Sequence, residues 1–114
     1  MKAEIVSHLR DVLGLDEADI PAIYESFLGT LTECADKLRG SLDPPDYLTI
    51  RAATHTIIGF ARNVGAMDLG DAATALNAAA HAADAAACSV GVSEILALRD
   101  RYVAEAAADG LSTP

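Results

Sequence analysis

Hydrophobic residues recur every three or four positions along most of this chain, the spacing that lines one face of an α-helix. Gly14, Gly40 and Gly65 each follow such a run, and the loop sequence GSLDPPDY separates two of them. The pattern therefore predicts five helices, with residues 88–92 as the last break. We expect them at residues 2–13, from Asp16 or Asp19 to about Arg39, from Asp43 or Asp46 to Val64, from Asp68 to about Ala83, and from Ser93 onward.

The predicted connection between the third and fourth helices is a tight turn from Gly65 to Met67. A turn this short makes two helices antiparallel neighbours. Alanine on their inner faces lets them approach closely. We therefore expect an all-α fold, namely an up-down antiparallel four-helix bundle with a short additional N-terminal helix. One domain is expected to span residues 1–114, with fraying from Asp109 onward.

Composition and charge narrow the class of partner. Apolar residues make up 52% of the chain but only five residues are aromatic, which favours helices over sheet. The net charge of −9 repels nucleic-acid phosphates and anionic lipids, so we expect neither as a partner. No apolar run approaches the ~20 residues that cross a bilayer, and the N-terminus lacks a signal-peptide core. We expect a cytoplasmic protein with no membrane insertion.

The segment from Ile50 to Ala66 has two unlike faces. Successive residues of a helix are turned by about 100°, so apolar residues such as Ile57 and Phe60 fall on one side. The opposite side carries His55, with Arg51, Ile58, Gly59 and Arg62 within about 60° of it. Packing in a core does not readily explain this second face, which is therefore the candidate functional site.

The residues of this face suit transfer of a phosphoryl group. Gly59 costs about 1 kcal/mol of helix propensity relative to alanine, and it clears space beside His55 for a macromolecule. Arg51 and Arg62 supply a local positive field, and neutral imidazole is a good nucleophile near pH 7. No carboxylate or second base in this stretch supports hydrolysis. We expect a carrier that makes no independent catalytic turnover.

The segment HTIIGFARNVGA, from His55 to Ala66, resembles the signature of histidine phosphotransfer (HPt) domains, roughly H-x-L-K-G-S-[SA]-x-x-[ILV]-G-A. His55 matches the phosphorylated histidine, Ile57 the buried aliphatic residue and Gly59 the glycine beside the histidine. The order of the predicted helices also agrees over nearly the whole chain. Two positions depart from the signature: Ile58 replaces the usual lysine or arginine, and Phe60 replaces a small hydroxyl residue.

The resemblance implies that His55 carries a phosphoryl group between the aspartates of receiver domains, or from a sensor histidine kinase, in a two-component phosphorelay. Arg51 or Arg62 would replace the missing cation at Ile58. No cofactor of this chain is implied, since magnesium belongs to the partner receiver. The apolar docking patch around the histidine would consist of Leu48, Ala52, Ile58 and Gly59.

Other interpretations remain open from the sequence. The same fold could dock receivers or kinases without being phosphorylated, an interpretation that Ile58 favours. A generic helical interaction or dimerisation protein is a further alternative, and a hydrolase fits least. The remaining reactive side chains are expected to be structural or solvated and to form no metal site: His8, Cys34, His81 and Cys88.

Overall fold

The computed structural model describes residues 1–111 and confirms the all-helical prediction: the described residues contain five helices and no strand. The helices are α1 (Ala3–Asp11), α2 (Ile20–Arg39), α3 (Tyr47–Val64), α4 (Met67–His81) and α5 (Ala85–Ala108). The fraying expected from Asp109 onward falls in part on residues 112–114, which lie outside the described residues. None of the described helices is both long and apolar enough to cross a membrane.

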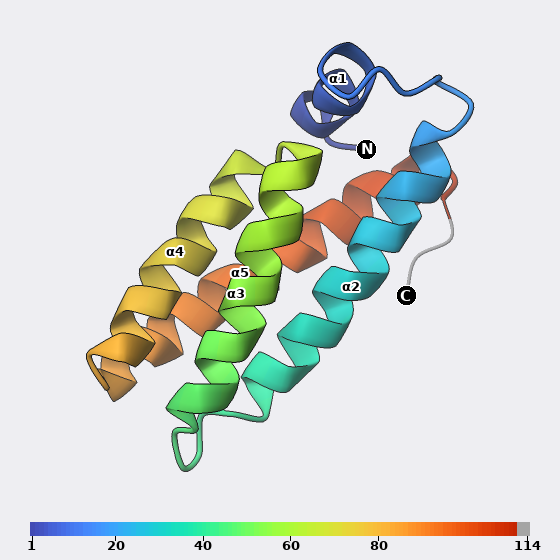
Figure 1. The fold of residues 1–114 in the computed structure, drawn as a ribbon. Coiled ribbons are helices and arrows are strands. Elements are labelled where there is room, and N and C mark those ends of the chain that lie inside the picture. Colours follow the sequence, from blue (N-terminus) through green and yellow to red (C-terminus); the bar gives the residue numbers. More distant parts are fainter. Residues whose placement is uncertain (112–114) are drawn as a thin grey trace.

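The four longer helices lie side by side, and α1 packs across one end of them (Figure 1). Each of α2, α3, α4 and α5 contacts two of the others, in the closed order α2–α3–α4–α5. Each helix runs back beside the one before it, an order expected of an up-down bundle. Among the described helices, the short α1 packs closest to α2 and α3. This arrangement leaves the outer face of α3 uncovered along most of its length.

The ends of α3 follow the sequence prediction closely. Asp46 caps its N-terminus by accepting a hydrogen bond from the backbone N–H of Thr49, at 3.1 Å. Gly65 ends it in the left-handed conformation, with φ +79°. A β-carbon on Gly65 would lie 2.5 Å from Cγ of His8, so this glycine also lets α1 approach. His8 is half-buried there, as expected of a structural histidine.

The boundary between α4 and α5 corrects the sequence prediction. Residues 88–92 are not a break, because α5 already begins at Ala85. The true break is at residues 82–84, where Ala83 has φ +52° and Asp84 accepts a hydrogen bond from the N–H of Ala87. Gly91 belongs to the helix interior for a packing reason, since a β-carbon there would meet Leu76 Cδ1 at 2.9 Å. It marks a close approach of α4 and α5.

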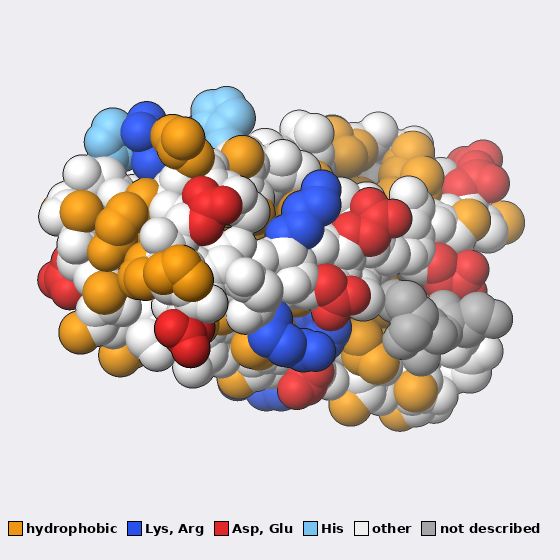
Figure 2. All heavy atoms as spheres, turned by 90° about the horizontal axis from the view of Figure 1, so that it is seen from below, with side chains coloured by type: hydrophobic (Ala, Val, Ile, Leu, Met, Phe, Trp, Pro, Cys, Tyr) orange, Lys and Arg blue, Asp and Glu red, His pale blue; other side chains and the backbone are white. Residues whose placement is uncertain are grey.

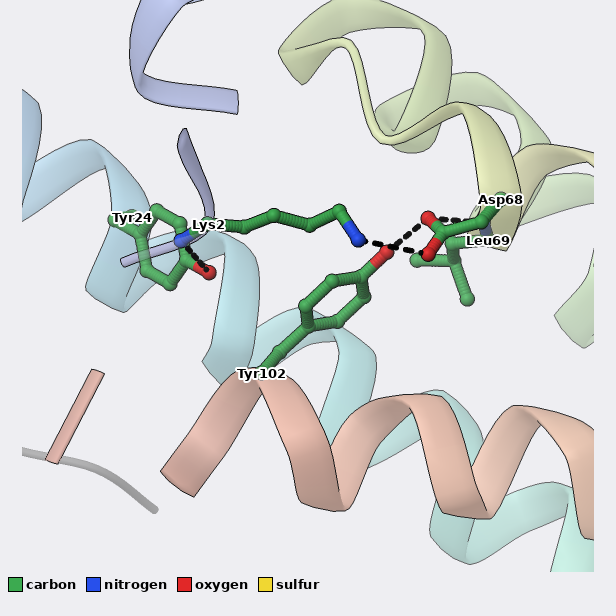
Figure 3. A network of polar contacts seen from close by, with 5 residues as sticks. All are labelled: Lys2, Tyr24, Asp68, Leu69 and Tyr102. Carbon is green, nitrogen blue, oxygen red and sulfur yellow. Dashed lines mark hydrogen bonds and ion pairs between the residues drawn. The ribbon is translucent and has the colours of Figure 1, made fainter. Parts of the chain in front are cut away.

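A second correction concerns Asp68, which is not the N-cap of α4. The helix begins at Met67, and Asp68 lies within its first turn. Its carboxylate instead binds the ammonium group of Lys2 at 3.0 Å and accepts a hydrogen bond from the hydroxyl of Tyr102 (Figure 3). The N–H of Lys2 donates to the hydroxyl of Tyr24. This network ties the segment before α1 to α2, α4 and α5.

The network shifts the proton affinities of its members. Burial alone would raise the pKa of Asp68, but hydrogen bonds from Tyr102 and Lys2 outweigh it and hold that pKa below its ordinary value. Burial and the neighbouring carboxylate raise the pKa of Tyr102. The hydrogen bond to Asp68 raises the pKa of Lys2. The ionised pair is therefore the favoured state near neutral pH.

Phe60 packs against the core, as its place on the apolar face of the helix predicted. Its half-buried ring meets the ring of Phe27 edge-on, with centroids 5.6 Å apart, and Phe27 also contacts Tyr24 and Tyr102. The aromatic side chain at this position is thus a packing variation. Both cysteines are free and buried, and burial raises the pKa of each thiol.

Candidate functional site

His55 lies midway along α3 with its side chain exposed, beside a shallow pocket of about 550 Å³ between α3 and α4. The space-filling view shows two histidine side chains at one edge of the molecule, with a basic and a hydrophobic side chain between them (Figure 2). Three predicted site residues join His55 in lining this pocket. Its lining residues are Leu48, Arg51, Ala52, His55, Asn77 and His81.

A buried hydrogen bond fixes how the two helices of this pocket face each other. The hydroxyl of Thr54, which is fully buried, donates to the side-chain oxygen of Asn77 at 3.1 Å and shares its proton with the backbone oxygen of Arg51 at 2.9 Å. Thr54 precedes His55, so this contact places Asn77 beside the histidine. The amide nitrogen of Asn77 has no partner among residues 1–111 and remains a donor for a group in the pocket.

The same contact sets the level of the other polar groups. The helices α3 and α4 are antiparallel, so one turn toward the N-terminus of α3 corresponds to one turn toward the C-terminus of α4. Arg51, about one turn before Thr54, therefore lies at the level of His81, one turn after Asn77. The pocket therefore has two layers about 5.4 Å apart, with His55 and Asn77 in one and Arg51 and His81 in the next.

The two arginines predicted for the site occupy different places. Arg51 is half-buried in the pocket with His55, whereas Arg62 is exposed and lines a separate pocket with Met67, Gly70 and Asp71. Seven residues of helix place Arg62 about 10 Å along the axis from His55. Neither arginine forms an ion pair within residues 1–111. Both are free to meet a negative charge from outside the chain.

A further unpaired cation flanks the histidine helix. Lys37 of α2 lines the groove on the other side of α3, together with Ala52 and Thr56, and it too has no ion pair with the described residues. Of the other basic side chains, Lys2, Arg10, Arg39 and Arg99 form ion pairs with carboxylates, and Arg101 lies away from this face, in the groove between α4 and α5. In a chain of net charge −9, this leaves three unpaired cations around the exposed face of α3. Glu33 lies in the groove of Lys37 and Asp71 in the pocket of Arg62, whereas no carboxylate of the described residues lines the pocket of Arg51 and His55. That pocket is therefore the one best suited to a negatively charged ligand.

The predicted docking residues differ in exposure. Leu48 is 77% exposed, which is unusual for a large apolar side chain, and Ala52 is also exposed. Ile58 is half-buried and packs against the core, so only part of it faces outward. A β-carbon built on Gly59 would meet nothing within 4 Å. No contact within residues 1–111 therefore explains why this helix position is glycine, which fits a requirement set by an external partner.

The sequence alone did not identify Lys37, Asn77 or His81 as neighbours of the site. Asn77 and His81 lie more than twenty residues after His55, in an alanine-rich run that carries no motif. The only available signal was helical spacing, since they are four residues apart and share one face of α4. Within residues 1–111 there is no cluster of three or more histidine, cysteine or acidic side chains that could hold a metal ion.

Comparison with known proteins identifies a family. The model of the family described as "Hpt domain" matches residues 22–108, about three quarters of the chain. The match begins inside α2 and so leaves out α1, but it includes the whole pocket around His55. The comparisons with curated proteins and with solved structures returned no significant match.

Proposed function

This chain belongs to the Hpt domain family, and we propose that it carries a phosphoryl group on the imidazole of His55. Hpt domains are phosphocarrier modules of two-component signalling that interact with kinases and receiver domains. The observation that carries the assignment to His55 is its position: it is exposed, it lies within the matched region, and it shares a pocket with the unpaired Arg51.

The proposed reaction is a direct transfer. A ring nitrogen of neutral His55 attacks the phosphorus of an aspartyl phosphate on a receiver domain. The nitrogen–phosphorus bond forms as the bond from phosphorus to the aspartate oxygen breaks, and the electron pair leaves with the aspartate carboxylate. The reverse reaction on another receiver regenerates the free imidazole. The magnesium ion that such a reaction requires is expected on the receiver.

This chain contributes placement and charge. Gly59 leaves open space next to the imidazole, and the patch formed by Leu48, Ala52, Ile58 and Gly59 is proposed to contact the partner. Arg51 is in place to offset the charge of the incoming phosphoryl group. No carboxylate among the described residues lines the pocket, so no negative charge from its lining opposes an incoming phosphoryl group.

The decisive experiment is incubation with a phosphorylated receiver domain. The wild-type protein should acquire a label that is labile in acid and stable in alkali, and His55→Gln should lose it. His8→Gln is the control, because it removes a histidine that lies outside this pocket, and it should still take up label. Label that persists in His55→Gln would contradict the assignment.

A docking module that is never phosphorylated is the second candidate. The specific observation in its favour is Ile58, an uncharged and half-buried residue at the position where the family signature has a cation. Binding of the receiver without any label on the wild-type protein would support this alternative.

A further inference from the structure

We propose that His81 is a proton-dependent phosphoryl-binding residue of the pocket, which faces the phosphoryl group on His55 together with Arg51. This inference rests on the proposed carrier function and extends it, because it makes phosphoryl retention depend on pH through a second histidine. His81 is the last residue of α4, is exposed, and lines the same pocket as His55.

The register of α3 against α4 places His81 at the level of Arg51, one helical turn from His55. The hydrogen bond from Thr54 to Asn77 aligns α3 with α4, and His81 follows Asn77 by one turn. Arg51 precedes His55 by one turn on the antiparallel helix. His81 and Arg51 therefore share the layer next to His55, one from each helix.

The direction in which helical side chains lean bears on where the imidazoles of His55 and His81 lie. A side chain on a helix leans toward the N-terminus of that helix. On α3 this direction takes the imidazole of His55 toward the layer of Arg51 and His81. On α4, which runs the opposite way, it takes the imidazole of His81 toward the layer of His55. Both imidazoles therefore flank the pocket that the two helices share, with a basic and a hydrophobic side chain between the two rings (Figure 2).

The surroundings of His81 leave it free to change its charge. Arg51 and His55 face it from α3, and Tyr47 lies close by, since its hydroxyl donates to the backbone oxygen of Ala83. Asp84, the N-cap of α5, follows His81 by three residues, and its carboxylate already accepts a hydrogen bond from the N–H of Ala87. His81 forms no hydrogen bond or ion pair within residues 1–111.

Phosphorylation would change which charge state of His81 is favoured. A phosphoryl group carries close to two negative charges at neutral pH. An imidazolium beside it gains a charge-assisted hydrogen bond to a phosphoryl oxygen. His81 would thus take up a proton from solvent as His55 becomes phosphorylated. Imidazole is the side chain whose charge changes between pH 5 and 8, so the effect falls in that range.

The test measures the transfer equilibrium between a phosphorylated receiver and this protein from pH 6 to pH 8.5. Three variants are compared with the wild type: His81→Gln, which is always neutral, His81→Lys, which stays charged, and Arg101→Gln as a control for net charge on α5. Arg101 makes no ion pair within residues 1–111 and lies in the groove between α4 and α5.

The wild type should hold about three- to tenfold more label than His81→Gln at pH 6, a difference that disappears by pH 8.5. His81→Lys should hold more label than His81→Gln at both pH 6 and pH 8.5. Arg101→Gln should hold as much label as the wild type at every pH. A ratio of wild type to His81→Gln that is constant with pH would overturn the inference. So would a Lys variant that behaves like the Gln variant.

A second measurement does not depend on transfer. Inorganic phosphate is titrated into the unphosphorylated protein while NMR follows the imidazole signals, with the half-buried His8 as an internal reference. Phosphate should move the signals of His81 and not those of His8. If the wild type takes no label, the carrier function fails, and a lack of response at His81 would then remove this inference as well.

Discussion

The hydroxyl of Thr54 and the side-chain oxygen of Asn77 lie 3.1 Å apart, and this contact joins α3 to α4 directly behind His55. Thr54 is fully buried, so its hydroxyl has no access to water and depends on partners within the protein. The bond holds the amide of Asn77 beside the histidine and aligns Arg51 with His81. Several properties of the site should therefore depend on one residue that the partner never touches.

Removing the hydroxyl of Thr54 should weaken both the fold and the site. Thr54→Val keeps the shape of the side chain but leaves Asn77 without its donor, which should lower the free energy of unfolding by about 1–2 kcal/mol. It should also slow phosphoryl transfer, because Asn77 is no longer held. Urea unfolding and a transfer assay measure the two effects. Thr54→Ser is the control: it keeps the hydroxyl and should retain transfer, so equal loss in both variants would contradict the role of the bond.

Gly59→Ala should raise stability while lowering transfer. An added methyl group meets nothing in the chain, and alanine is better than glycine in a helix by up to about 1 kcal/mol. The same methyl group would lie where the partner approaches His55. Gly29→Ala on α2 is a matched control, because that position is also helical and equally open. Both variants should be stabilised, and only Gly59→Ala should transfer more slowly. Transfer at the wild-type rate in Gly59→Ala would show that the partner does not need the open space at Gly59.

The two arginines should contribute unequally to transfer. Arg51 shares the pocket with His55, whereas Arg62 lines another pocket about 10 Å along the helix. Arg51→Ala should therefore reduce the transfer rate about tenfold, which corresponds to about 1.4 kcal/mol, and Arg62→Ala no more than about twofold. Rates are compared at fixed ionic strength, with Arg101→Ala as the charge control. An equal or larger loss in Arg62→Ala would show that Arg62, and not Arg51, offsets the charge of the phosphoryl group.

The contribution of Asp68 to stability should depend on pH. Its pKa is held below the ordinary value of 3.8, so the ionised carboxylate is favoured by folding. The stabilisation is present above about pH 5 and is lost as the pH falls through the lowered folded-state pKa. At pH 7 Asp68→Asn should be less stable than the wild type by about 1 kcal/mol, a modest value because the pair is partly exposed.

The difference for Asp68→Asn should shrink as the pH falls below 3.8 and through the lowered folded-state pKa, because the wild-type carboxyl then takes up a proton as well. Urea unfolding at pH 7, 5 and 3 gives the comparison. Asp71→Asn, on an exposed residue of the same helix without an ion pair in residues 1–111, should show no such trend. A difference for Asp68→Asn that is independent of pH would mean that shape, not charge, sets its contribution.

Both ends of α3 were predictable from local signals, whereas the local signal at Asp68 was misleading, because α4 begins one residue before it. Asp46 caps α3 and Gly65 ends it because both functions require only the residue and its immediate neighbours. The break between α4 and α5 was misplaced because alanine favours helix on both sides of it, and Ser89 and Gly91 looked like stronger signals than Asp84. Gly91 serves packing against Leu76, which is a contact across two helices.

By itself, the sequence determined the all-helical fold, the apolar face of α3 and the exposed position of His55, since periodicity fixes which face each residue of a helix occupies. It also carried the family, through the residues from His55 to Ala66. Only the tertiary structure decided which side chains from other helices stand beside the histidine. The register of α3 against α4 depends on a buried contact between Thr54 and Asn77, residues far apart in the chain, and no local pattern encodes such a pairing.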